Sequence, residues 1–232
     1  MNDKVLRTAV LVDGGFYRKR SKYLWGKKTP EKRADELYAY CMAHIQEKSS
    51  YERYLYRIFY YDCPPISQVV YHPLLKKQID FSKQETYSWS NEFFNCLKTK
   101  RKVALRMGEL SDEFIGFTLP PQKIKQLCAE KITVHDLTEK DFKVTFSQKG
   151  VDMRIGLDIA ALAYKKQVDQ IILISGDSDF VPAAKLARRE GIDFILDPMW
   201  STIRPSLTEH IDGLKSQWKP RKKSENTKET DK

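Results

Sequence analysis

The sequence lacks the features of several familiar classes of protein. Its four cysteines, Cys41, Cys63, Cys96 and Cys128, lie far apart and form no CxxC or CxxH pair, which argues against a zinc module and favours buried, reduced thiols. No run approaches the ~18 apolar residues that a membrane-spanning helix needs, and the first residues lack the apolar stretch and cleavage site of a secretory signal. We therefore expect a soluble, cytoplasmic protein without a membrane partner.

Two common kinds of functional site are also missing. Gly14-Gly15 is not followed by the Lys-Ser or Lys-Thr ending that a P-loop needs to hold a nucleotide. The histidines show no mutual spacing typical of a metal site or a nucleophilic triad; they are His44, His72, His135 and His210. Surface or core roles are therefore expected for all of them.

Basic residues, by contrast, are in excess. The 232 residues include 41 Lys and Arg against 31 Asp and Glu, which gives a formal net charge of +10. Such a surplus favours a polyanionic partner, because cations that neutralise phosphates release counterions. A basic protein without such a partner is the alternative. Hydrophobic residues make up 41% of the chain, enough for a sizeable packed core.

Apolar runs predict a parallel sheet. Residues 8–12, 171–174 and 193–196 form continuous runs without alternation, as in strands covered by helices on both faces. Residues 54–61 and 103–108 are further strand candidates. Each of the first three runs ends abruptly at a segment that begins with Asp or with Ser-Gly-Asp.

Helical patterns lie between these runs. Apolar residues at helical spacing predict helices over 31–48, 153–164 and 180–190, and Gly191 supplies a stop for the last of them. We interpret residues 68–100 as mostly helical, whereas residues 111–141 show no clear pattern. The alternation of strands and helices predicts a single α/β domain with a parallel sheet flanked by helices.

The domain is expected to span residues 5–213, with a variable middle region over 62–140. Residues 214–232 are expected to form a basic, disordered tail, since the last part of the chain has almost no apolar content.

Acidic residues follow the predicted strands. Asp13 ends the first run, Asp177 and Asp179 follow Ser175-Gly176, and Asp152 precedes a helix that leads into the second run. Ligands of open parallel sheets bind beyond the carboxyl ends of the strands. Clustered carboxylates repel one another unless a cation neutralises them, and oxygen donors without His or Cys favour Mg²⁺ or Mn²⁺. Each acid taken alone has another interpretation, as a helix cap or turn residue.

Three motifs carry a specific resemblance. VDGGFYRKR from residue 12, QKGVDMRIGLDI from residue 148 and ILISGDSDFVPAAKLARREG from residue 172 resemble the NYN domain, a branch of the PIN-like nuclease superfamily. The resemblance implies a Rossmann-like sheet and a metal-dependent ribonuclease site built from Asp13, Asp152, Asp177 and Asp179. Ser175 and Gly176 would support that site.

Three points in this pattern need comment. Many NYN members carry Asn three residues after the first Asp, where this chain has Phe16. PIN-like sites often take another acid from the helix after the first strand; Glu36 and Glu47 are candidates, although a solvated helix face is the favoured role. Asp158 is typical of NYN sequences and lies nearly two turns from Asp152, which places it in a supporting role.

Cations and aromatic residues follow the first motif. Arg18, Lys19, Arg20 and Lys22 are candidates for contacts with an RNA backbone. The nearby rings of Tyr17, Tyr23 and Trp25 could stack on unpaired bases, so single-stranded RNA is the expected substrate. An ordinary solvated basic segment is the alternative.

Two other functions remain open. A phosphatase of the haloacid dehalogenase type also has Asp after its first strand, but it needs a second Asp two residues later, where this chain has Gly15. A catalytically weak or inactive NYN scaffold that binds nucleic acid in a regulatory role is the stronger alternative, because Phe16 replaces the usual Asn.

Overall fold

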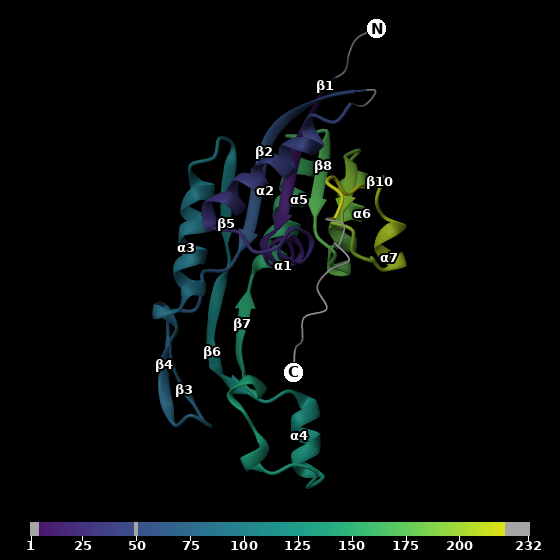
Figure 1. Ribbon diagram of the computed structural model, residues 1–232. Coiled ribbons are helices and arrows are strands. Elements are labelled where there is room, and N and C mark those ends of the chain that lie inside the picture. The colour runs from purple at the N-terminus through teal and green to yellow at the C-terminus, as the bar shows by residue number, and fades with distance from the viewer. Residues whose placement is uncertain (1–4, 49–50, 221–232) are drawn as a thin grey trace.

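A six-stranded parallel sheet forms the centre of the protein (Figure 1). The computed structural model describes residues 5–48 and 51–220, without the side chains of residues 111–114 and 147–148. The strands lie in the order β10-β9-β8-β1-β2-β5. Their bounds are β1 Val5–Asp13, β2 Glu52–Asp62, β5 Val103–Met107, β8 Gln170–Ile174, β9 Asp193–Asp197 and β10 Gly213–Leu214. The predicted α/β fold with a parallel sheet is confirmed.

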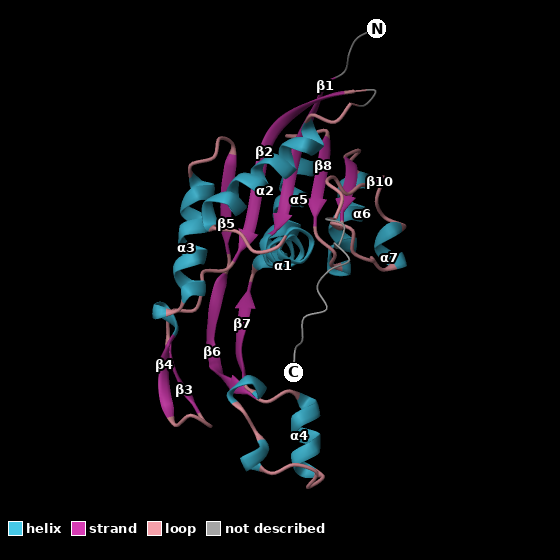
Figure 2. Ribbon diagram, in the orientation of Figure 1, coloured by secondary structure: helices cyan, strands magenta, loops and turns pink. Residues whose placement is uncertain are grey.

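Helices cover both faces of the sheet (Figure 2). One face packs against α1 (Gly14–Trp25), α2 (Pro30–Ile45) and α3 (Glu85–Lys98), and the other against α5 (Val151–Tyr164), α6 (Val181–Arg189) and α7 (Pro205–Thr208). Successive residues of β1 therefore enter opposite cores: Val10 and Val12 enter the first, and Ala9 and Leu11 the second. Burial on both faces explains the continuous apolar runs.

A separate arm extends from the sheet (Figure 1). It contains the antiparallel strands β6 (Glu109–Thr118) and β7 (Lys143–Lys149), with helix α4 (Pro121–Cys128) between them. At the end of β7 the chain turns through Gly150, whose φ of 84° lies in the left-handed region that favours glycine. This turn starts α5 and brings Asp152 to the edge of the sheet.

The helical interpretation of residues 68–100 is wrong for its first part. Residues Val69–His72 (β3) and Lys77–Asp80 (β4) form an antiparallel hairpin, and only α3 is helical over a long stretch. In β3, Val70 and His72 are buried while their neighbours are exposed, which is the period of a half-buried strand. The ring of His72 packs 4.3 Å from that of Phe117 on β6. A tertiary contact with the arm thus decides the local structure.

The folded region continues past the expected boundary at residue 213. Leu214 pairs with Leu196 in the sheet, and the ring of Trp218 lies 5.6 Å from Trp25 and 5.3 Å from Tyr40. Residues 214–218 are therefore part of the domain and not of a tail, because they cover aromatic side chains that would otherwise face water. Residues 221–232 lie outside the described residues. No helix within the described ranges is long and apolar enough to cross a membrane.

Candidate active site

The acidic residues meet at the carboxyl ends of β1, β2 and β8. Asp13 and Asp62 are the last residues of β1 and β2, and the two strands are neighbours in the sheet. A cavity of about 360 Å³ lies above them, lined by Asp13, Gly15, Asp62, Gly150, Val151, Asp152 and Met153. Carboxylates from β1, β2 and α5 thus line one cavity, which three separate segments of the chain build.

A chain of hydrogen bonds joins Asp13 to the segment after β8. One carboxylate oxygen of Asp13 accepts from the hydroxyl of Ser175 at 3.1 Å, and that hydroxyl oxygen accepts from the N–H of Asp177 at 3.2 Å. Asp177 in turn accepts from the N–H of Asp179 at 3.0 Å. Ser175 is fully buried, so it holds the two acidic segments at a set spacing.

The acids also differ in their structural roles. The second carboxylate oxygen of Asp13 accepts from the N–H of Phe16 at 3.0 Å and caps α1, and Asp177 caps the short turn that precedes α6. For these two residues the capping interpretation is correct, and it coexists with their place at the site. Asp152 caps nothing, because Gly150 occupies the N-cap of α5.

Burial and mutual repulsion act on the same carboxyl groups. Burial raises the pKa of Asp13, and the charges of Asp152 and Asp62 raise it further, against hydrogen bonds that lower it. Burial also raises the pKa of Asp152, with added repulsion from Asp177 and Asp179. All five acids therefore belong to one coupled set in which negative charge is only partly balanced.

Asp62 is a member of this set that the sequence reasoning missed. Its side chain is almost completely buried and accepts from the Arg18 guanidinium at 2.9 Å and from the Tyr60 hydroxyl at 2.9 Å. Burial raises its pKa, and the charge of Arg18 opposes that rise. The signal was present, since Asp62 ends a predicted strand just as Asp13 does.

The chemistry of this donor set fits a hard divalent cation. Carboxylate oxygens without accompanying His or Cys are the donors that Mg²⁺ and Mn²⁺ prefer, and the surplus negative charge is what such an ion would neutralise. Within the described part of the chain, no three His, Cys, Asp or Glu side chains lie close enough together to coordinate one ion directly. The carboxylates therefore share one edge of the sheet without converging on one point.

Phe16 and Gly176 lie in direct contact. A Cβ atom added at Gly176 would be 2.7 Å from Cε2 of Phe16, so the ring takes the space that a side chain at residue 176 would need. Phe16 also lines a shallow cavity together with Asp13, Lys19 and Asp177. An apolar ring thus occupies the place where NYN relatives carry an Asn.

Asp158 lies beside the site and not in it. Its carboxylate accepts from the hydroxyl of Tyr61 at 2.8 Å and from Nε of Arg106 at 3.1 Å. It lines none of the cavities that contain the other acids. These contacts tie α5 to β2 and β5.

The four candidate RNA-binding cations have different surroundings. Lys19 is exposed and lines the same cavity as Asp13 and Asp177. Lys22 is exposed beside a second cavity, which Arg18 also lines. Arg20 is held in place, because its guanidinium donates to the carbonyl of Met199 at 2.7 Å.

Two of the proposed stacking rings cannot meet a base. Tyr17 is fully buried, with its hydroxyl donating to Glu36 at 3.2 Å, and Trp25 is buried against Tyr40; only Tyr23 is well exposed. The expected solvated role of Glu36 is also wrong, since its carboxylate is buried in an ion pair with Arg33. Glu47 pairs with Lys215 and Arg53, so neither glutamate joins the acidic set.

Comparison with known proteins gives a match to the NYN domain over residues 96–206. Residues 96–206 carry an NYN domain. The matched NYN segment contains Asp152, Ser175, Asp177 and Asp179, and it begins after Asp13 and Asp62. The NYN domain belongs to the PIN-like nucleases, which typically depend on metal ions, and it is associated with nucleic acid.

Two individual proteins are similar to this chain. An uncharacterized protein of Methanocaldococcus jannaschii is 22% identical over 121 residues, which cover 50% of this chain and 50% of that protein. The chain thus spans about half the length of this relative. A crystal structure of a protein of unknown function from Vibrio parahaemolyticus covers 92% of this chain and 93% of its own, with a TM-score of 0.44 and 14% identity. Neither description states an activity.

Proposed function

We propose that this protein is a metal-dependent ribonuclease that hydrolyses RNA phosphodiester bonds at the acidic edge of the sheet. The observation that carries the proposal is the joining of Asp13, Asp152, Asp177 and Asp179 at one edge by hydrogen bonds and mutual repulsion. An NYN domain that contains three of these residues supports it.

Each residue has a distinct role in this proposal. Asp13, Asp152 and Asp177 hold Mg²⁺ or Mn²⁺, and Asp179 is either a further ligand or an orienting group. The ion supplies a bound, activated water and stabilises the leaving oxygen. Ser175 orients Asp13 through its hydroxyl, and the exposed backbone at Gly15 lets a phosphate approach closely.

The substrate is proposed to be single-stranded RNA. Lys19, which lines a cavity with Asp13 and Asp177, can contact a phosphate next to the scissile bond. Arg18 serves the site indirectly, because its guanidinium holds the carboxylate of Asp62. Arg20 contributes no phosphate contact while it is bonded to the Met199 carbonyl.

A nonenzymatic NYN scaffold that binds nucleic acid is the second candidate. The contact between Phe16 and Gly176 favours it, because an apolar ring there can neither bind an ion nor orient a water. Under this alternative the basic surface would bind RNA and the carboxylates would not turn it over.

The two candidates are separated by an RNA cleavage assay in Mn²⁺ and in EDTA. Under the proposal, wild type cleaves only with metal, and Asp13→Asn and Asp177→Asn each lose more than about 100-fold, since even outer-shell partners of a metal cost 10–100-fold. Asp35→Asn is the matched control, because Asp35 is an exposed acid on α2. Metal-independent cleavage, or full activity in both site variants, contradicts the proposal. RNA binding by wild type without turnover favours the scaffold.

A further inference from the structure

A basic cavity lies next to the acidic one. It has a volume of about 400 Å³, within the range of ligand pockets, and lies between α1, the segment that connects α1 to α2, and the start of α3. Its lining residues are Arg18, Lys22, Lys27, Lys28, Arg33, Glu85, Thr86, Trp89 and Ser90. Five of these nine are cations and one is an acid, so the cavity favours an anionic occupant.

The cations of this cavity are not all engaged in ion pairs. Lys28 and Arg33 both bond to the buried carboxylate of Glu36, and Arg18 is paired with Asp62. Lys22 and Lys27 are exposed, and no acidic partner is found for either of them within the described residues. These two ammonium groups are therefore available to phosphate oxygens.

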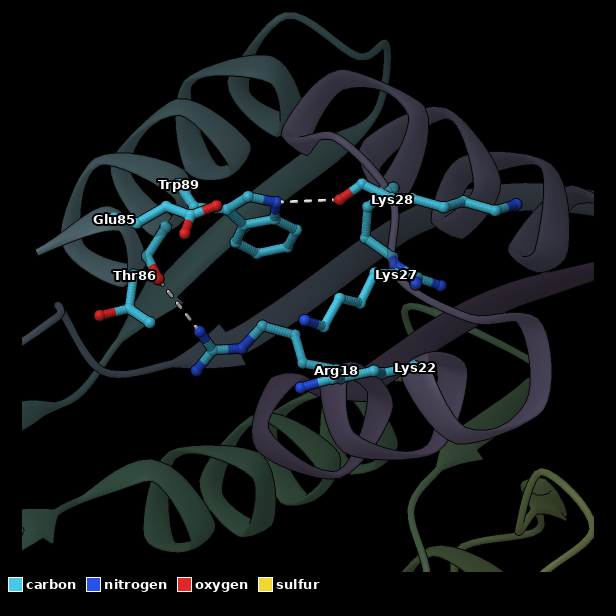
Figure 3. Close-up of a pocket in the computed structure, with 9 residues that line it drawn as sticks. Arg18, Lys22, Lys27, Lys28, Glu85, Thr86 and Trp89 are labelled. Carbon is cyan, nitrogen blue, oxygen red and sulfur yellow. Dashed lines mark hydrogen bonds between the residues drawn. The ribbon is translucent and has the colours of Figure 1, made fainter. Parts of the chain in front are cut away.

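A rigid aromatic ring forms another part of the wall. The indole of Trp89 projects from α3 toward the segment that carries Lys27 and Lys28 (Figure 3). Its Nε1 donates to the Lys28 carbonyl at 3.0 Å, and its ring stacks on Phe93 with centroids 5.2 Å apart. An indole held in this way can stack on a nucleobase with little loss of conformational freedom.

The basic cavity is joined to the acidic one through a single ion pair. Arg18 reaches from α1 across the basic cavity toward α3 (Figure 3) and donates to Ser90 at 3.4 Å. The same guanidinium donates to Asp62, which lines the acidic cavity with Asp13 and Asp152. An RNA strand whose phosphate lies at the carboxylates therefore has the basic cavity as its adjacent site.

We propose that this cavity is a nucleotide subsite for single-stranded RNA, with the base stacked on Trp89 and the phosphates held by Lys22 and Lys27. This inference rests on the proposed function for its substrate, but it concerns binding and can be tested apart from cleavage. It places one end of the bound strand over α1 and α3, and it gives the protein an RNA-binding site in which the carboxylates take no part.

Binding of a fluorescein-labelled oligouridylate in EDTA tests the subsite, with fluorescence anisotropy as the measurement. The variant Lys22→Ala/Lys27→Ala removes two exposed cations and leaves the core intact. Its salt dependence should fall by about 1.4, at ~0.7 for each phosphate contact on a single strand. By the same relation, binding at ~0.05 M salt should weaken on the order of 50-fold. Trp89→Leu should weaken binding without changing the salt slope, because a stacking contact releases no counterion.

The control is Lys165→Ala/Lys185→Ala, which removes the same charge from exposed positions that line none of the described cavities. The inference is overturned if Lys22→Ala/Lys27→Ala binds like this control, or if Trp89→Leu binds like wild type. The proposed function fails independently if wild type binds the oligouridylate through this cavity and never cleaves RNA in Mn²⁺. If cleavage occurs and both cavity variants keep the wild-type KM, the RNA lies elsewhere and the subsite is refuted.

Discussion

Replacing Asp13 by Asn and by Ala separates the charge of this side chain from its structural role. Asn keeps an oxygen that can accept from the N–H of Phe16 and caps helices about as well as Asp, whereas Ala removes the cap at a cost of about 1 kcal/mol. For a chain of this size, 1 kcal/mol corresponds to roughly 2–4 °C in Tm. Asp13→Ala should therefore unfold a few degrees below Asp13→Asn.

The pKa of Asp13 sets the sign of the comparison with wild type. Burial, Asp152 and Asp62 raise this pKa in the folded state, so the folded protein binds the proton more tightly than the unfolded chain does. Above the raised pKa the ionised carboxylate destabilises the fold. Asp13→Asn should thus be at least as stable as wild type near neutral pH. The gap between them should close as the pH falls through the raised pKa toward that of the unfolded chain.

Addition of Mn²⁺ should reverse this order. An ion at 100 times its Kd stabilises the protein that binds it by about 2.7 kcal/mol, which is roughly 5–11 °C in Tm. Wild type and the surface control Asp35→Asn should show this gain, and both Asp13 variants should lose most of it. Thermal melts followed by circular dichroism, with EDTA or Mn²⁺ at several pH values, measure every part of the prediction. Equal Mn²⁺ shifts in all four proteins, or Asp13→Asn melting with Asp13→Ala, would refute the reasoning.

Three further predictions concern how the site is held in the fold. In Gly14→Ala the new Cβ would be 2.5 Å from both the Tyr60 ring and a backbone carbonyl, so we expect a loss of at least about 3 kcal/mol in urea unfolding; wild-type stability would contradict the packing. Gly176→Ala should destabilise through its 2.7 Å contact with Phe16, and adding Phe16→Ala should recover part of the loss, with a coupling of about 0.5–3 kcal/mol in a double-mutant cycle; additive effects would show that the contact is unimportant. Asp197 is fully buried and accepts from a tyrosine hydroxyl, a serine hydroxyl and a backbone N–H, so Asp197→Ala should cost at least about 3 kcal/mol and expose residues 214–218 to limited proteolysis. An unchanged digestion pattern would argue against that anchoring role.

Several parts of the fold were predictable because their causes are local. The strands β1, β8 and β9 are buried on both faces, and such strands show as apolar runs in any context. Helix α5 has buried residues at helical spacing, among them Ile155 and Ile159. The hairpin of β3 and β4 was not predictable, because packing against β6 in the arm is what favours strands over residues 69–80.

The same division applies to the candidate site. Asp13 and Asp177 stand directly after strands, so their place at one edge of the sheet follows from sequence order and strand direction. Asp62 obeys the same rule, but its membership depends on the pairing of β2 with β1 and on the salt bridge to Arg18. Which cations face the cavity also depends on tertiary contacts, as the carbonyl of Met199 shows by holding Arg20.

The sequence by itself determined the fold class, the order of the strands along the chain and most of the acids at the site. Hydrophobic periodicity and the residues that end strands are properties of short segments, and short segments retain them in isolation. Only the tertiary structure decided that Tyr17 and Trp25 are core residues, that Asp62 lines the acidic cavity and that a basic cavity lies beside it. Those outcomes depend on contacts between residues far apart in the chain, whose burial and pairing no local pattern encodes.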